Sequence, residues 1–250
     1  MKSNRHKIRG ICAALTAALT LTYAPLGMCN AAADMVYEQS FNAAAINGMP
    51  EEVNVSGGKA RVIESGKNNK AFEIIHGSRT AVTFPAASDA QKYIISFDIS
   101  ADKEVNAAVS VKSGTASHEL IKISQNTIKT AEGREIGGVS VIAAGENEPC
   151  GRMTNVAIAV NRKSGLMSVY TDGRECVGDW RLNDTSKPDA VVLTKYSDDS
   201  NIYIDNVAVY EGEELLDVTL TGTYNEDGEE FFSFTDDLGD FTFFHSSWPG

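Results

Sequence analysis

Apolar residues recur at every second position along most of this chain after its first 33 residues. The segments 93–100, 105–112 and 156–161 place Tyr, Phe, Ile, Val or Ala at alternate positions, and most of the intervening residues are small or polar. Side chains on a strand point alternately to opposite faces, so each segment predicts a strand with one buried face. No segment shows a sustained helical period. The pattern therefore predicts an all-β fold.

Turn residues separate these segments at short intervals. Glycine with small, polar or charged neighbours occurs at 56–58, 66–69, 76–78, 163–165 and 172–173. Many short strands, spaced by about 8–12 residues, predict a sandwich or a barrel. Residues 34–212 are numerous enough to bury a full core as one domain.

One local segment predicts a specific hairpin. The β-rich run from Leu166 to Thr171 is followed by Asp172 and Gly173. A two-residue hairpin of type I′ needs positive φ at both turn positions, and Asp-Gly tolerates this conformation. We therefore expect a tight hairpin centred on this pair.

The N-terminal residues 1–33 resemble a secretory signal peptide. Four basic residues among the first nine precede an apolar run over 11–22, and alanine occupies positions 31–33. The run is too short for a lone transmembrane helix, which needs about 20 apolar residues. The pattern predicts cleavage after Ala33 and export to the medium or the cell surface. An uncleaved anchor and a lipoprotein modified at Cys29 are the alternatives, although Met28 is larger than the residue that usually precedes a lipoprotein cysteine.

The chain is strongly acidic. Its net charge is −12, and loss of the leader, which holds four basic residues and no acid, makes it more negative. An acidic surface disfavours nucleic acid and anionic lipid as partners, and no membrane association is expected after cleavage. Such acidity keeps an exported protein soluble, or some of the carboxylates bind calcium.

Two cysteines, Cys150 and Cys176, follow the predicted cleavage point. In an oxidising compartment such a pair most often forms a disulfide, although two buried thiols are the alternative. No histidine lies near either cysteine, so a zinc site is not expected.

Three segments together resemble a known group of domains. They are an opening strand at 37–41, the hairpin at 169–173 and a closing run at 203–207 with a single carboxylate inside it. In this order they are similar to the concanavalin A-like, laminin-G-like jelly rolls of exported bacterial proteins and to several carbohydrate-binding modules. The resemblance implies an antiparallel jelly-roll β-sandwich over residues 34–212.

The resemblance also implies a structural calcium ion, although no cofactor is certain. An aspartate at the place of Asp205 is a ligand in similar modules. We expect Glu38 to join it, because the first and last strands often lie side by side in these sandwiches. Carboxylate oxygens are the ligands that calcium prefers. A simple polar contact between the two residues is the alternative.

No motif in the sequence specifies a reaction. The paired carboxylates of jelly-roll glycoside hydrolases and the Gly-x-Ser-x-Gly elbow do not occur, so we predict no catalytic residue. Glycan binding needs exposed aromatic rings with hydrogen-bonding neighbours. Trp180, between Asp179 and Arg181, fits this requirement best. Tyr196 and Tyr170 are further candidates, and packing of Trp180 into the core is the alternative.

The last residues, 213–250, form an acidic tail with six of the ten phenylalanines of the chain. So much aromatic surface should be buried, either on the sandwich or in a second β domain that this chain begins. The sequence thus predicts a noncatalytic extracellular module that binds polysaccharide or acts as a spacer, with further domains of the same protein as partners. An accessory part of a polysaccharide-degrading enzyme and a surface adhesion protein are the alternatives.

Overall fold

The computed structural model describes residues 34–66, 69–104, 106–124, 127–133, 150, 153–196 and 198–212, and the backbone of three further strands. The predicted signal peptide, with its cleavage point and Cys29, lies outside the described residues. Within the part that is described, no helix is long and apolar enough to cross a membrane.

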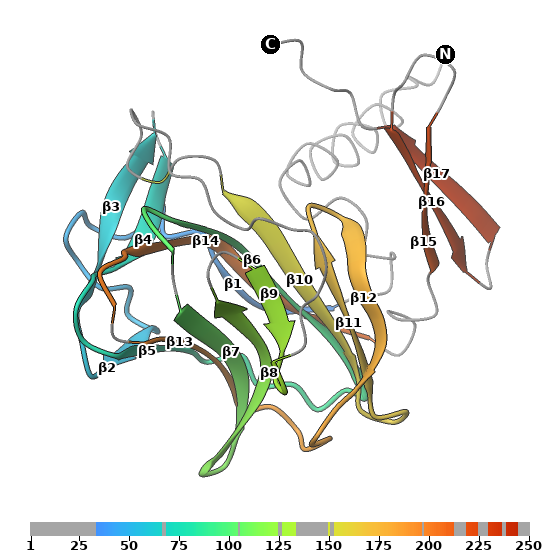
Figure 1. Ribbon diagram of the computed structural model, residues 1–250, viewed down its shortest axis with the longest axis horizontal. Helices are drawn as coiled ribbons and strands as arrows, with labels where there is room; N and C mark the ends of the chain where they lie inside the picture. The colour runs from blue at the N-terminus through green and yellow to red at the C-terminus, as the bar shows by residue number, and fades with distance from the viewer. Residues whose placement is uncertain are drawn as a thin grey trace, which may run out of the picture.

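The described strands form three antiparallel sheets (Figure 1). The larger sheet of eight strands contains β1 (Asp34–Gln39), β3 (Ala60–Gly66), β4 (Asn69–Ile74), β6 (Lys92–Ala101), β10 (Thr154–Asn161), β11 (Leu166–Thr171), β12 (Arg174–Arg181) and β14 (Ile202–Glu211). The sheet of six strands contains β2 (Asn54–Ser56), β5 (Thr80–Phe84), β7 (Asn106–Ser113), β8 (Ala116–Ser124), β9 (Thr127–Thr130) and β13 (Ala190–Lys195). A sheet of three strands contains β15 (Thr219–Tyr224), β16 (Glu230–Asp236) and β17 (Gly239–Phe244).

The two larger sheets pack face to face as a sandwich. The order in the first is β12-β11-β10-β6-β14-β4-β3, with β1 also on β14, and the order in the second is β2-β5-β13-β7-β8-β9. Strands that are neighbours in space are often distant in sequence, as in the pairs β6 with β14 and β7 with β13. The all-β sandwich predicted from the alternation is confirmed, and the fold is a concanavalin A-like jelly roll.

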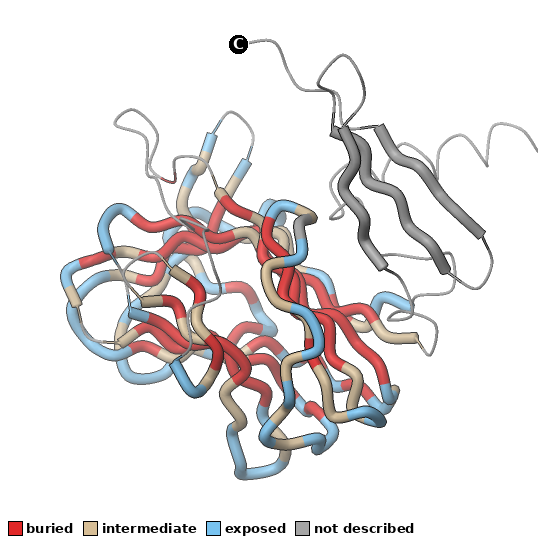
Figure 2. The backbone as a smooth tube through the Cα atoms, turned by 45° about the vertical axis from the view of Figure 1, so that its right-hand side comes forward, coloured by how far each residue is buried: buried red, intermediate tan, exposed pale blue. Residues whose placement is uncertain are grey.

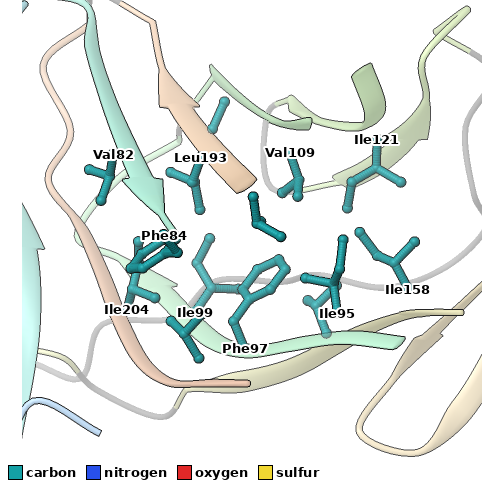
Figure 3. Packing of buried hydrophobic residues seen from close by; sticks show 14 of the residues in the cluster. Val82, Phe84, Ile95, Phe97, Ile99, Val109, Ile121, Ile158, Leu193 and Ile204 are labelled. Atoms are coloured by element: carbon teal, nitrogen blue, oxygen red, sulfur yellow. The ribbon is translucent and has the colours of Figure 1, made fainter. Parts of the chain in front are cut away.

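The core lies between the two sheets (Figure 3). From the first sheet, Ile95, Phe97 and Ile99 of β6 point inward, and Val109 of β7 and Leu193 of β13 meet them from the second sheet (Figure 3). All five side chains are buried, and Figure 2 shows that the buried positions concentrate on the strands of the sandwich. These positions are those that the period of two assigns to one face.

The hairpin predicted at Asp172 and Gly173 is confirmed. It joins β11 to β12, where Thr171 pairs with Arg174, and both turn residues have positive φ, at 47° and 78°. This twist matches that of the flanking strands, so the local sequence is sufficient to fix the connection.

Strand β14 changes its neighbour halfway along. Its first half pairs with β4 and its second half with β1, and β6 lies along the other side throughout. The ladder with β6 has a bulge between Asp205 and Ala208, where Asn206 has a φ of 48°. A bulge bends and twists a strand locally, which allows two short strands to share one edge. Asp205 therefore lies at a junction of strands.

A buried ion pair holds the loop that follows β13. Lys195 is fully buried, and its Nζ lies 2.5 Å from Oδ1 of Asp198. Asp198 also accepts hydrogen bonds from the backbone amides of Asn106 and Ser200. Burial by itself would raise the pKa of Asp198, but the hydrogen bonds from Lys195, Asn106 and Ser200 lower it below 3.8. The Asp198 carboxylate is therefore ionised at neutral pH.

The three C-terminal strands pair in register. Phe232 lies opposite Phe243, and Phe234 lies opposite Phe241. That residues 213–250 begin a separate domain stays a prediction.

Candidate functional site

A pocket opens at one edge of the sandwich, between β12 of the larger sheet and β8 of the smaller one. Its volume is about 200 Å³. Its walls come from residues 117–120 on β8, 131–132 after β9, Met167 on β11 and 180–184 at the end of β12. These segments are far apart in sequence, so only the packing of the two sheets brings them together.

Trp180 forms one wall of this pocket. It lies on β12, an edge strand, opposite Met167 of β11, which is buried in the core. Paired residues share a face, so the indole is directed towards the interior, but at an edge this interior is open. Trp180 is accordingly half-buried and packs against the core cluster. Trp180 therefore contributes both to the core and to a pocket wall, which are the two roles that the sequence left open.

The Glu132 carboxylate holds the indole. Its Oε2 accepts a hydrogen bond of 3.2 Å from Nε1 of Trp180, and its Oε1 accepts one of 2.6 Å from Nδ2 of Asn183. The three side chains come from two separate segments and form one network at the rim. A fixed indole with polar groups beside it is the arrangement that sugar rings require, because their C–H faces stack on aromatic rings and their hydroxyls need partners.

The rest of the pocket has an apolar part and an acidic rim. Leu120 and Met167 are buried and supply the apolar surface. The pKa of Glu132 is lowered by its own backbone amide and by Asn183, and that of Asp184 is lowered by hydrogen bonds from Ser186. Both carboxylates are therefore ionised at neutral pH.

The structure does not bring Tyr170 or Tyr196 to this pocket. Tyr170 is buried on the outer face of the larger sheet, in a cluster with Ala157 and Tyr210. Tyr196 lies at the end of β13, where its hydroxyl is 3.3 Å from Oε2 of Glu119 and the Arg79 guanidinium lies 5.6 Å from the centre of its ring. The three aromatic candidates therefore do not share one site.

Asp205 faces a second carboxylate on the outer face of the larger sheet. It is buried and lies directly opposite Asp98 of β6. Nδ2 of Asn69 donates to Asp205 at 3.0 Å, and the Asn206 and Asn155 amides donate to the two oxygens of Asp98 at 2.7 and 2.8 Å. Burial and the charge of Asp98 raise the pKa of Asp205 to about 6.

The predicted calcium pair does not form. The register places Glu38 opposite Ala208, three residues along β14 from Asp205, which corresponds to roughly 10 Å at about 3.3 Å per residue. Glu38 is exposed, and Asp205 is enclosed by amide donors instead. Among the described residues, no group of three or more His, Cys, Asp or Glu could hold a metal ion. The extent of the β1 pairing is the physical reason, since β1 pairs with β14 only from Val207 onward and Asp205 precedes that point.

We expect chelation to leave the stability of the protein unchanged. A ligand that binds only the folded state raises the melting temperature, so removal of a structural calcium ion would lower it. Thermal unfolding with EDTA and with added calcium tests this, and magnesium in place of calcium controls for ionic strength. A melting temperature that falls with EDTA and recovers with calcium alone would restore a calcium site.

The predicted disulfide is also corrected. Cys150 and Cys176 are both thiols in the structure. Cys150 packs with Ala71 and Tyr203 at β4 and β14, whereas Cys176 lies on β12 beside Thr171. Four strand spacings separate β12 from β14, roughly 15–20 Å, and a disulfide needs Cα atoms within about 7 Å.

Comparisons with known proteins support the fold. No protein-family model matches the sequence, and no curated protein matches it. A sialidase chain has a similar structure, with a TM-score of 0.53 and 11% identity over 79% of this chain. The chain spans 20% of the length of that sialidase. This likeness concerns the jelly-roll architecture.

Two smaller proteins are also similar in outline. Domain 4 of AbnA, a GH43 extracellular arabinanase from Geobacillus stearothermophilus solved with arabinotriose, has a TM-score of 0.43 and 15% identity over 72% of this chain and 94% of that domain. A protein from Bacillus subtilis with a galectin-like fold has a TM-score of 0.48 and 7% identity over 71% of this chain and 96% of its own.

Sequence reasoning missed most of the pocket. Glu132, Asn183 and His118 were not candidates. The structure places His118 on the pocket wall, with Nε2 3.7 Å from Oδ1 of Asp184. No local signal marks these residues, because Glu132 and Trp180 are 48 positions apart. Only Trp180 carried a signal, as a large aromatic residue between two charged ones.

Proposed function

We propose that the sandwich is a noncatalytic, extracellular glycan-binding module and that the Trp180 pocket is its binding site. The observation that carries the proposal is the hydrogen bond that holds the Trp180 indole against Glu132 at the open edge of the sandwich. It creates an oriented aromatic surface with acceptors beside it, and sugar recognition uses this combination.

The size of the pocket supports a small ligand or the end of a chain. Pockets that enclose drug-sized molecules hold roughly 300–1,000 Å³. At about 200 Å³, this one suits a single sugar ring. The sialidase and the arabinanase are named as enzymes that act on glycans, and these names support a glycan as the ligand that we propose. The predicted signal peptide supports the extracellular location.

We expect Trp180→Ala to weaken polysaccharide binding by about 10- to 100-fold, because removal of a central aromatic contact has an effect of this size at binding sites. The measurement is affinity electrophoresis against a panel of soluble plant and bacterial polysaccharides. Met49→Ala serves as the control, since it removes a large exposed apolar side chain outside the pocket, and it should bind as the wild type does.

Far-ultraviolet circular dichroism of both variants separates loss of binding from loss of folding, because Trp180 also packs on the core. Trp180→Phe retains an aromatic ring but not the bond to Glu132 and should show an intermediate loss. If none of the polysaccharides slows the migration of the wild-type protein, the glycan-binding proposal fails and the module is a spacer.

A further inference from the structure

The charges around the Trp180 pocket distinguish between classes of glycan. Among the described residues that line it, three are acidic, namely Glu119, Glu132 and Asp184, and the basic ones are Arg181 and the titratable His118. Glu119 is occupied on the outer side, by Lys122 at 3.1 Å and by Tyr196. The carboxylates that a ligand meets at the rim are therefore those of Glu132 and Asp184.

These two carboxylates are held as acceptors. Glu132 accepts hydrogen bonds from Nε1 of Trp180 and Nδ2 of Asn183. Asp184 accepts one from the backbone amide of Ser186 at 2.6 Å. Each carboxylate has about four lone-pair positions, so further donors can still approach both. Sugar hydroxyls are such donors, whereas a carboxylate or sulfate group on a sugar brings a second negative charge and no donor.

We infer that the pocket selects uncharged glycans and excludes uronic and sulfated ones, with Glu132 and Asp184 as the residues that determine this specificity. The inference rests on the proposed function of the same pocket. The rim carboxylates repel a negatively charged group on a ligand, and this repulsion weakens with salt because mobile ions screen exposed charges. The overall acidity of the chain acts in the same direction, with a net charge of −12.

Arg181 does not reverse this balance. It lies on the same strand as Trp180 and is exposed, so it supplies one positive charge against two carboxylates, and water screens it as it screens the exposed Glu132. His118 faces Asp184, with its Nε2 3.7 Å from Oδ1. Two carboxylates against the single guanidinium leave the rim acidic among the residues described.

The test uses the full chain with Trp248→Phe, which leaves Trp180 as the single tryptophan, since the sequence has two. Trp180 fluorescence then reports binding in the pocket itself. Neutral probes are galactomannan, arabinan and xyloglucan, and acidic probes are polygalacturonate and alginate. Titrations are performed at about 20 mM salt, where exposed charges interact over a long range, and at about 500 mM salt, where mobile ions screen them strongly.

We expect the neutral probes to shift the fluorescence and the acidic ones not to do so at low salt. The double variant Glu132→Gln with Asp184→Asn should gain affinity for the acidic probes by about tenfold or more at low salt, and the gain should shrink at high salt. The double variant Glu64→Gln with Asp199→Asn removes the same charge from exposed positions outside the pocket and should gain much less.

Two results would overturn the inference and are separable from one another. If the wild type binds acidic probes as tightly as neutral ones, or if both double variants behave alike, the charge selection is wrong while glycan binding stands. If no probe of either kind binds, the proposed function fails and the inference fails with it.

Discussion

Asp198→Ala should lower the free energy of unfolding by about 3–5 kcal/mol, the effect expected when one partner of a buried ion pair is removed. Lys195 is fully buried, and Asp198 is its charged partner at 2.5 Å. Without Asp198, the ammonium group would stay in the interior without a counter-charge. The backbone amides of Asn106 and Ser200 would lose their acceptor as well.

Urea unfolding followed by circular dichroism measures this effect. Lys195→Met is the matched variant, because it removes the buried charge and leaves Asp198 with three other hydrogen bonds, so its loss should be smaller. Asp198→Asn should fall between the two, since it retains an acceptor for the loop. Equal losses for Asp198→Ala and Lys195→Met would contradict the uncompensated-charge explanation.

The same pair makes stability depend on acid pH. The pKa of Asp198 in the folded protein lies below 3.8, so the pair contributes its full stability above about pH 4 and loses it as pH falls through the folded pKa. In Asp198→Asn this part of the acid-dependent loss should be absent.

Asp205→Asn should stabilise the protein at pH 8 by about 2–3 kcal/mol and flatten the dependence of stability on pH between 4 and 7. Burial and Asp98 raise the pKa of Asp205 from 3.8 to about 6. Burial raises the pKa of Asp98 too, and the charge of Asp172 adds to this effect. At pH 8 the folded protein therefore holds the buried carboxylate of Asp205 opposite the half-buried carboxylate of Asp98, and the two repel each other.

The sign follows from proton uptake. A folded pKa above the unfolded one means that the native state takes up the proton first, so stability of the wild type rises as pH falls from 7 towards 4. Asparagine cannot ionise and removes that rise. The two carboxyls titrate as a pair, and Asp98→Asn should give a similar but smaller change.

Chemical denaturation at several pH values measures the effect. Asp199→Asn removes an exposed carboxylate and serves as the control, with no change expected in the slope against pH. If Asp205→Asn lowers stability at pH 8 and retains the slope, the hydrogen bonds from Asn69 and Asn206 outweigh the repulsion between the carboxylates.

The strands and their connections depend on nearest neighbours in the chain. Alternation over 93–100 predicted β6 with Ile95, Phe97 and Ile99 on its buried face, and the structure confirms this. Asp172 and Gly173 predicted the hairpin because positive φ is a property of the residues themselves. Local preferences of this kind need no knowledge of the other sheet.

The partners of a side chain depend instead on register and packing across long separations. Asp205 was expected to meet Glu38, but β1 pairs with β14 only beyond Asp205, and the register with β6 places Asp205 opposite Asp98. Cys150 and Cys176 were expected to pair, but Cys150 lies outside the strands and packs against β4 and β14, whereas Cys176 lies on the edge strand β12. A shift of two residues keeps the same side chains on the buried face and is invisible in the alternation, yet it changes every cross-strand contact.

For the candidate site, the sequence by itself determined that Trp180 is a large aromatic residue between two charged ones and that no known catalytic motif accompanies it. The tertiary structure decided that this strand is an edge, that Glu132 fixes the indole, and that β8 closes the other side of the pocket. The alternation reports which face of a strand is buried, but the end of a sheet and the gap between two sheets arise only when segments distant in sequence have packed together.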